Sequence, residues 1–343
     1  MNPSTAAATP SLRVIGAAVD VYKKVFTQPT LSPPRPVRHN GFNLDVRVEA
    51  VHAEAADVVS LTLAGVEGGS LPSWRPGSHI DVFLASGRQR QYSLCGDPRD
   101  RHRYRIAVRR LDDGDGGSRE MHTLRSGDRL RIRGPRNAFT FVETAPSYLF
   151  IAGGIGITPI LPMARAAGGR GRLVYLGRSR ATMPFLGELP AGTDVRPDDE
   201  FGTPDLPALL ATAARGAAVY VCGPPPVLDA AQRSLFALNP TASLHTELFS
   251  ARPVTDGEEF DVTLARSGET LRVGSTETAL DAIRRARPDV AYSCRQGFCG
   301  SCKTKVVAGE IDHRDRLLPA GERADQMLTC VSRSAGGALT LDL

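Results

Sequence analysis

The chain has 343 residues, of which 41% are hydrophobic and 23% are charged. This length exceeds what one hydrophobic core usually holds and predicts two or three domains, and the ordinary apolar fraction excludes a largely disordered protein. The formal net charge is +5, but the basic residues are scattered among acidic ones, with no Lys/Arg run interleaved with aromatic residues. A nucleic-acid partner is therefore not expected.

No apolar stretch approaches the roughly 18 residues that a membrane-spanning helix needs, so no membrane span is expected. The best candidate for the apolar core of a leader peptide is VIGAAV at 14–19, which is short and is followed by Asp20. We therefore expect a cytoplasmic protein, whose cysteines are reduced and serve as metal ligands or reactive groups.

Residues 1–40 open with small residues and close with PTLSPPRPVR, a Pro-rich stretch typical of an extended linker. Between these two parts, SLRVIGAAVDVYKKVF fits a short amphipathic helix. Packing of this helix on the next domain is the expected role, and contact with a membrane or a partner is the alternative.

The rest of the chain carries three different patterns. In residues 41–143, short alternations such as FNLDVRVEAV, HIDVFLA and RLRIRG are broken by Gly, Pro and Asp, which predicts a small antiparallel barrel or sandwich. In residues 144–250, continuous apolar runs such as YLFIAGG and AAVYVCG alternate with helical stretches, which predicts a parallel α/β sheet. A polar connector at 251–257 leads to residues 258–343, where a hairpin, a helix (TALDAIRRAR) and a cysteine-rich loop indicate an α+β domain.

Four of the six cysteines lie in this last part: Cys294, Cys299, Cys302 and Cys330. Their spacing is C-x4-C-x2-C, then 27 residues (303 to 329) and the fourth cysteine, which is the plant-type [2Fe–2S] arrangement. The small residues of CRQGFCGSC let three thiolates converge and let backbone N–H groups turn toward the cluster sulfurs. Zinc sites favour pairs of C-x2-C, and disulfides conflict with the expected compartment, so both alternatives are disfavoured.

The tail AYSCRQGFCGSCKTKVVAGEIDHRD…DQMLTCVSRS resembles the ferredoxin domain of the family of phthalate dioxygenase reductase and the vanillate demethylase reductase subunit. The resemblance runs from about residue 41 to the end. It implies a flavin-binding β-barrel at 41–143, an NAD(P)-binding α/β domain at 144–250 and a β-grasp-like [2Fe–2S] ferredoxin domain at 258–343. The first 40 residues lie outside it.

The strand RQYS carries Arg90, Tyr92 and Ser93, the R-x-Y-S pattern of the ferredoxin-reductase superfamily. In an extended strand Arg90 and Tyr92 share one face, so that the ring can lie on a flavin while the guanidinium approaches its phosphate. The downstream segment GGSREMH adds Gly116, Gly117 and Ser118, a glycine turn with Ser118 opening a helix, whose N–H groups would face an anion.

Three further flavin contacts are implied by the resemblance. The backbone around Ala107 and Val108 would touch the flavin ring, and Phe249 in HTELFS would cover one face of it. The alternative for Phe249 is a core position at a domain junction. The resemblance also implies FMN rather than FAD.

The turn AGGIGITP follows an apolar strand and holds Gly153, Gly154, Gly156, Thr158 and Pro159. Its glycines would let the backbone approach a cofactor pyrophosphate, although their spacing is not G-x-G-x-x-G. The alternative is a turn that only connects a strand to a helix. The family's nicotinamide domain also implies a second segment beside the nicotinamide, made of Cys222, Gly223 and Pro224.

The adenosine ribose would lie at Gly177, Arg178 and Ser179, after the strand RLVYLGR. No acidic residue stands in this turn to bind a free ribose hydroxyl, and Arg178 and Arg180 could accept a phosphate instead. Similar turns occur in family members that use NADH, so NADH is expected and NADPH is the alternative.

Hydride carries two electrons and a [2Fe–2S] cluster accepts one, so a flavin between them has to store the difference. The resemblance therefore implies a reductase, expected as a monomer, that passes electrons from NADH through FMN and the cluster to a terminal oxygenase of the Rieske type or an O-demethylase. No residue is expected to act as a general acid, base or nucleophile. The alternatives are a reductase of a haem monooxygenase, a redox-sensing or electron-carrier iron–sulfur protein, and a metal-free flavin reductase.

Overall fold

The computed structural model describes residues 43–66, 68–114, 116–249, 254–288, 290–292, 295–297, 300–315 and 317–343. By its internal contacts the chain divides into one unit of residues 1–41 and a second of residues 42–343. The helix and linker predicted for residues 1–40 lie outside the described residues. None of the described helices is long and apolar enough to cross a membrane.

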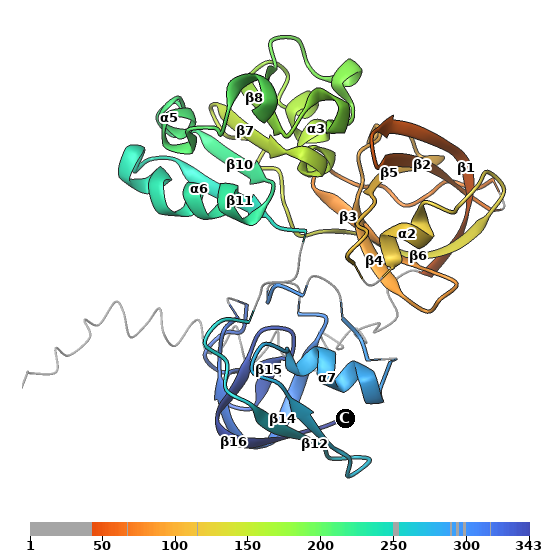
Figure 1. Ribbon diagram of the computed structural model, residues 1–343, viewed down its shortest axis with the longest axis vertical. Helices are drawn as coiled ribbons and strands as arrows, with labels where there is room; N and C mark the ends of the chain where they lie inside the picture. The colour runs from red at the N-terminus through yellow and green to blue at the C-terminus, as the bar shows by residue number, and fades with distance from the viewer. Residues whose placement is uncertain are drawn as a thin grey trace, which may run out of the picture. The chain divides into compact units, whose positions relative to one another are not determined.

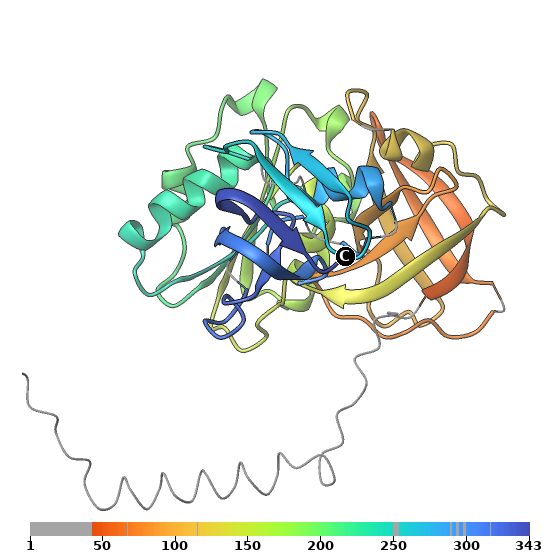
Figure 2. The ribbon, with the colours of Figure 1, turned by 90° about the horizontal axis from the view of Figure 1, so that it is seen from below.

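The first of three sheets is antiparallel, with strand order β4-β3-β6-β1-β2-β5. Its strands are β1 (Asn43–Ala55), β2 (Val58–Gly65), β3 (Ser78–Phe83), β4 (Gln89–Ser93), β5 (Arg103–Arg109) and β6 (Arg129–Asn137), with helix α2 (Gly117–Met121) before β6. The sheet curls on itself (Figures 1 and 2), and the Cys95 N–H, just after β4, donates to the Arg105 carbonyl of β5 at 2.9 Å. This is the antiparallel β-barrel that the alternating pattern predicts.

The second sheet is parallel, with strand order β11-β10-β7-β8-β9. Its strands are β7 (Tyr148–Gly153), β8 (Gly171–Gly177), β9 (Asp194–Pro197), β10 (Ala218–Cys222) and β11 (Ser243–Glu247). Its α-helices are α3 (Ile157–Ala166), α4 (Asp198–Phe201), α5 (Leu206–Ala211) and α6 (Pro225–Leu238), with 3-10 turns η1 (Gly154–Gly156), η2 (Arg180–Thr182) and η3 (Leu186–Glu188).

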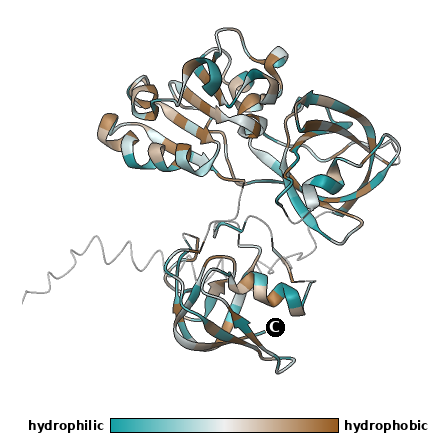
Figure 3. Cartoon of the chain, viewed as in Figure 1, coloured by the Kyte–Doolittle hydropathy of each residue, from teal (hydrophilic) through white to brown (hydrophobic). Residues whose placement is uncertain are grey.

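Helices cover both faces of this parallel sheet. Phe150 of β7 packs with Ile160 of α3 in one hydrophobic cluster, while its neighbour Ile151 packs with Leu228 of α6 in another. Because both faces are buried, the strands are apolar along most of their length, as the colouring of β7 and β10 shows (Figure 3). The α/β domain predicted from the continuous apolar runs is confirmed.

The third sheet is mixed, with strand order β13-β12-β16-β14-β15. Its strands are β12 (Phe260–Leu264), β13 (Thr270–Val273), β14 (Lys303–Asp312), β15 (Gln326–Leu328) and β16 (Arg333–Leu341), with helix α7 (Ala279–Ala286). Strands β12 and β13 form the expected hairpin, and β12 and β16 run parallel. The Thr278 hydroxyl caps α7 by accepting from the Asp281 N–H at 3.1 Å. Sheet and helix together give the predicted α+β domain.

Candidate functional site

The flavin strand predicted from RQYS is β4, which pairs with β3 and carries Arg90, Tyr92 and Ser93. Tyr92 is half-buried against the barrel core, and Ser93 is buried. Ala107 and Val108 lie on β5 and are also buried, at 5% and 1% exposure. The barrel therefore holds these five residues on two strands, and their contacts with a flavin remain a prediction.

Arg90 lies directly against the glycine pair at the start of α2. A Cβ added at Gly117 would stand 2.5 Å from Arg90 Nε, and a Cβ at Gly116 would lie 3.6 Å from Arg119 Nη2 and 3.7 Å from Arg88 Nη2. Three guanidinium groups thus converge on one glycine turn. Phosphate is bound by such planar, charged donors, so the described residues fit the phosphate of FMN.

The helix after this turn differs slightly from the prediction. It begins at Gly117 with Gly116 as its N-cap, which has a φ of 90°, and not at Ser118. The Ser118 hydroxyl is within hydrogen-bond distance of the Leu111 backbone, accepting from its N–H at 3.0 Å. Arg88 and Arg119 were missed, because neither falls within the R-x-Y-S pattern or the glycine pair.

The two loops predicted to flank the nicotinamide pack closely against each other. Strand β7 ends at Gly153 and β10 ends at Cys222, next to it in the sheet. A Cβ at Gly156 would stand 2.2 Å from the Cys222 carbonyl oxygen, and one at Gly153 would stand 2.7 Å from Pro224 Cδ. Only glycine permits this approach.

These loops lie where the strand order of the parallel sheet reverses. The chain leaves β7 toward β8 on one side, while β10 lies on the other, so the strand order reverses between β7 and β10. Ligands of open parallel sheets bind in the crevice at such a reversal, beyond the carboxyl ends of the strands. Gly154 lies in η1, and Thr158 and Pro159 lie buried in the first turn of α3, as expected.

Glu247, a residue that the sequence analysis missed, lies beside Cys222. The two are register partners at the ends of β11 and β10. Glu247 Oε2 is buried without a hydrogen-bond partner among the described residues, and burial raises the pKa of this carboxyl to about 8. Burial, and next the Glu247 charge, raise the pKa of the Cys222 thiol well above its ordinary value. Burial thus favours the protonated form of both groups.

Phe249 follows two residues later and is 47% exposed. The alternative that it is a core residue at a domain junction is therefore wrong. A period of two places Glu247 and Phe249 on the same face of an extended chain, which is the signal that could have identified Glu247 from HTELFS.

The expected ribose turn begins where β8 ends at Gly177 and continues through Arg178 and Ser179. The turn itself has no acidic residue, but α4 brings two to it. Arg180 Nε lies 2.8 Å from Glu200 Oε1 and its Nη2 lies 3.1 Å from Oε2, and the Asp199 N–H donates to the Arg178 carbonyl at 3.1 Å. One of the two arginines considered for a phosphate thus already has a carboxylate partner.

Two of the four predicted cluster ligands, Cys294 and Cys299, lie outside the described residues. Cys302 precedes β14 and Cys330 follows β15, and the structure brings these two positions together. The N–H and the hydroxyl of Thr329 both donate to the Cys302 carbonyl, at 3.3 and 3.2 Å. Cys302 and Cys330 are buried in one hydrophobic cluster, which fits thiolate ligands of a shielded iron–sulfur centre.

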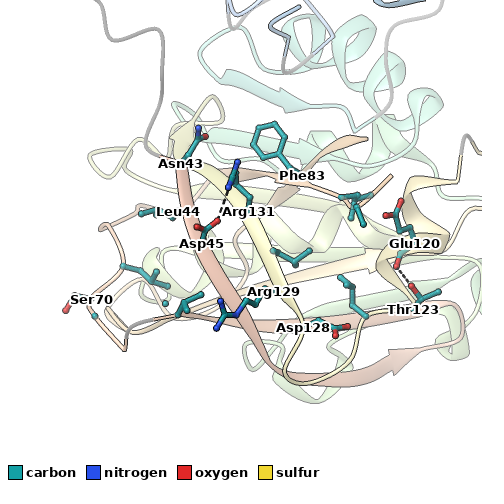
Figure 4. A pocket seen from close by; sticks show the side chains of 18 residues that line it. Asn43, Leu44, Asp45, Ser70, Phe83, Glu120, Thr123, Asp128, Arg129 and Arg131 are labelled. Atoms are coloured by element: carbon teal, nitrogen blue, oxygen red, sulfur yellow. Dashed lines mark hydrogen bonds and ion pairs between the residues drawn. The ribbon is translucent and has the colours of Figure 1, made fainter. Parts of the chain in front are cut away.

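A cavity of about 1070 Å³ opens on another part of the barrel (Figure 4). The Asp45–Arg131 ion pair, with Arg131 Nε 3.3 Å from Asp45 Oδ1, lies in its wall. None of the predicted cofactor residues that the structure describes lines this cavity. The cavity is therefore separate from the candidate site.

Comparison with protein families supports the assignment of the C-terminal part. Residues 262–335 match the family model described as a 2Fe-2S iron-sulfur cluster binding domain. Together with the barrel and the parallel sheet, this domain defines the chain as an iron–sulfur flavoprotein oxidoreductase.

Known proteins similar to nearly the whole chain make the assignment more specific. Phenoxybenzoate dioxygenase subunit beta of Ectopseudomonas oleovorans is 42% identical, over 88% of this chain and 97% of that protein. The heme-dependent oxidative N-demethylase beta subunit of Ectopseudomonas mendocina is 37% identical, over 88% and 99%. Phthalate dioxygenase reductase of Burkholderia cepacia is 35% identical, over 89% and 99%.

A solved structure of phthalate dioxygenase reductase, titled as a modular structure for electron transfer from pyridine nucleotides to [2Fe–2S], covers 88% of this chain and 98% of its own, with a TM-score of 0.67. The chain belongs to the phthalate dioxygenase reductase family.

Proposed function

We propose that this protein is the reductase component of an oxygenase system and carries electrons from NADH through FMN and a [2Fe–2S] cluster to a terminal oxygenase. The observation that carries the proposal is the presence, in one chain, of the arginine-lined turn at Gly116 and Gly117, the packed loops at the reversal of the parallel sheet, and a 2Fe–2S domain. When bound, the flavin would accept a hydride and release electrons singly.

The chain's own residues bind and orient the cofactors in this proposal. Arg90, with Arg88 and Arg119, holds the FMN phosphate. The loops at Gly153–Gly156 and Cys222–Pro224 hold NADH with its nicotinamide toward the flavin, and Phe249 covers the flavin face. Cys294, Cys299, Cys302 and Cys330 bind the cluster. We further propose that the protein is a cytoplasmic monomer.

The acceptor is proposed as a Rieske-type oxygenase, because two of the similar proteins are named for dioxygenases. A haem oxygenase is the second candidate, because another relative is the subunit of a heme-dependent N-demethylase. Activity reconstituted with each type of oxygenase would decide between them.

Absorption spectra recorded without oxygen, before and after NADH addition, test the proposal itself. We expect flavin and iron–sulfur bands that both bleach. A colourless protein, or a coloured one that NADH does not bleach, would contradict the proposal. Bleaching of the flavin band alone in a protein without iron would indicate a metal-free flavin reductase.

A further inference from the structure

Tyr292 contacts the flavin strand of the barrel although it belongs to the ferredoxin domain. The Gln89 side chain donates from Nε2 to the Tyr292 carbonyl at 3.1 Å, and the Tyr292 hydroxyl donates to the Gln89 carbonyl at 3.2 Å. The same Gln89 carbonyl accepts from Arg90 Nη1 at 2.7 Å. One carbonyl oxygen therefore joins Tyr292 to the arginine that faces the glycine turn.

A second donor reaches the Tyr292 carbonyl from β6. Arg133 Nη2 lies 3.4 Å from it, and Arg133 Nε donates to Asp81 Oδ2 at 2.9 Å. Asp81 is fully buried and also pairs with Arg136 Nη2 at 2.5 Å. The ion pair with this buried carboxylate orients the Arg133 side chain, because rotation away from Asp81 would give up a charge-assisted hydrogen bond.

The contact joins two residues that are close in sequence to predicted cofactor ligands. Tyr292 stands two residues before Cys294 in the sequence, and Gln89 stands next to Arg90. Tyr292 is 6% exposed, and Arg284 Cζ lies 4.1 Å above its ring, so its position is fixed from the ferredoxin side as well.

We propose that Asp81, Arg133 and Gln89 are positioning residues that hold Tyr292 of the ferredoxin domain against the flavin strand, and that this contact supports electron transfer from the flavin to the cluster. The inference rests on the proposed function. It assigns to these three side chains a role in the step from flavin to cluster and none in hydride uptake.

Arg133→Met and Gln89→Leu each remove one donor to the Tyr292 carbonyl. In Arg133→Met, Asp81 keeps Arg136 as its partner, and Gln89→Leu leaves Asp81 untouched, so the two variants do not share a risk of misfolding. Arg131→Met is the matched control, because Arg131 lies on the same strand and pairs only with the exposed Asp45 among the contacts found for it.

The holoprotein is compared by hydrogen–deuterium exchange and by stopped-flow absorption. We expect the rate of hydrogen exchange in peptides covering β4 and Tyr292 to rise roughly three- to tenfold in each variant, because the loss of one hydrogen bond lowers local stability by about that factor. Arg131→Met should leave this rate unchanged. Cluster reduction should slow by a similar factor. Flavin reduction by NADH and the cluster midpoint potential should stay at wild-type values.

Wild-type exchange and wild-type cluster reduction in both variants would overturn the inference while leaving the proposed function intact. A lowered midpoint potential with unchanged exchange would also overturn it, because the side chains would then act on the cluster and not on the contact. Failure of the proposed function looks different, since the wild-type protein would then show no electron transfer from NADH to the cluster.

Discussion

Arg90 and Gly117 lie so close together that Arg90 Nε is 2.5 Å from the point where a Cβ on residue 117 would stand. The guanidinium thus occupies the space that any larger residue would need. The lack of a side chain at Gly117 therefore leaves room for the Arg90 guanidinium beside the glycine pair.

Gly117→Ala should therefore weaken FMN binding, because the methyl group displaces Arg90 from the turn. We expect a loss of at least about tenfold in affinity, the size of one charge-assisted hydrogen bond of 1.5–3 kcal/mol. Flavin fluorescence titration of the apoprotein measures it. Gly69→Ala is the matched control, because no atom of the residues that the structure describes lies within 4 Å of a Cβ there. Equal FMN affinity in the two variants would exclude Gly117 from the phosphate site.

Cys302→Ser should abolish cluster binding but leave hydride uptake by the flavin intact, because Cys302 lies in the ferredoxin domain and the flavin strand in the barrel. Iron and labile sulfide content and the rate of flavin reduction by NADH test this. Cys95→Ala is the control, a buried cysteine of the barrel region that should leave the iron content unchanged. Loss of flavin reduction in a folded Cys302→Ser protein would show that the two modules are not separable.

The sequence predicted the features that depend on local patterns. Each domain type has a signal in neighbouring residues. These signals are the alternation along β1 and β6, the glycines at the ends of β7 and β10, and the spacing of the cysteines. The three domain types could therefore be inferred directly.

Contacts between distant segments could not be predicted in the same way. Gln89 and Tyr292 are 203 residues apart, and Glu200 reaches Arg180 only because two neighbouring parallel strands end at the same edge of the sheet. Nothing in the turn at Gly177 to Arg180 indicates a carboxylate partner, so the sequence left open whether its arginines bind a phosphate.

Glu200→Gln should raise the use of NADPH relative to NADH, because it releases Arg180 for a ribose phosphate. The pair is exposed, with 51% and 43% of the two side chains accessible, so we expect a shift of only a few-fold in the ratio of kcat/KM values, and a smaller one at high salt. Asp194→Asn is the control, since Asp194 pairs with Arg172 and Arg196 on the strands β8 and β9 and not with the ribose turn. An unchanged ratio in Glu200→Gln would mean that Arg180 does not contribute to coenzyme choice.

Glu247 should make the stability of the protein depend on pH. Burial raises the pKa of this carboxyl from 4.5 to about 8, so the folded protein keeps the proton over a range in which the unfolded chain has lost it. The stabilising contribution is therefore complete below pH 4.5 and declines as the pH rises toward 8, by at most a few kcal/mol at about 1.4 kcal/mol per unit of pKa.

Glu247→Gln replaces the protonated carboxyl with a neutral group of similar shape and should remove this decline. Urea unfolding of both proteins between pH 5 and 8 gives the two free energies of unfolding. This range lies between the ordinary and the raised pKa of the carboxyl. The difference between them should change steadily with pH in favour of the variant, because the wild type alone has a buried carboxyl to ionise. Parallel pH profiles would show that the Glu247 carboxyl is already ionised in the folded protein. They would contradict a protonated carboxyl at the end of β11.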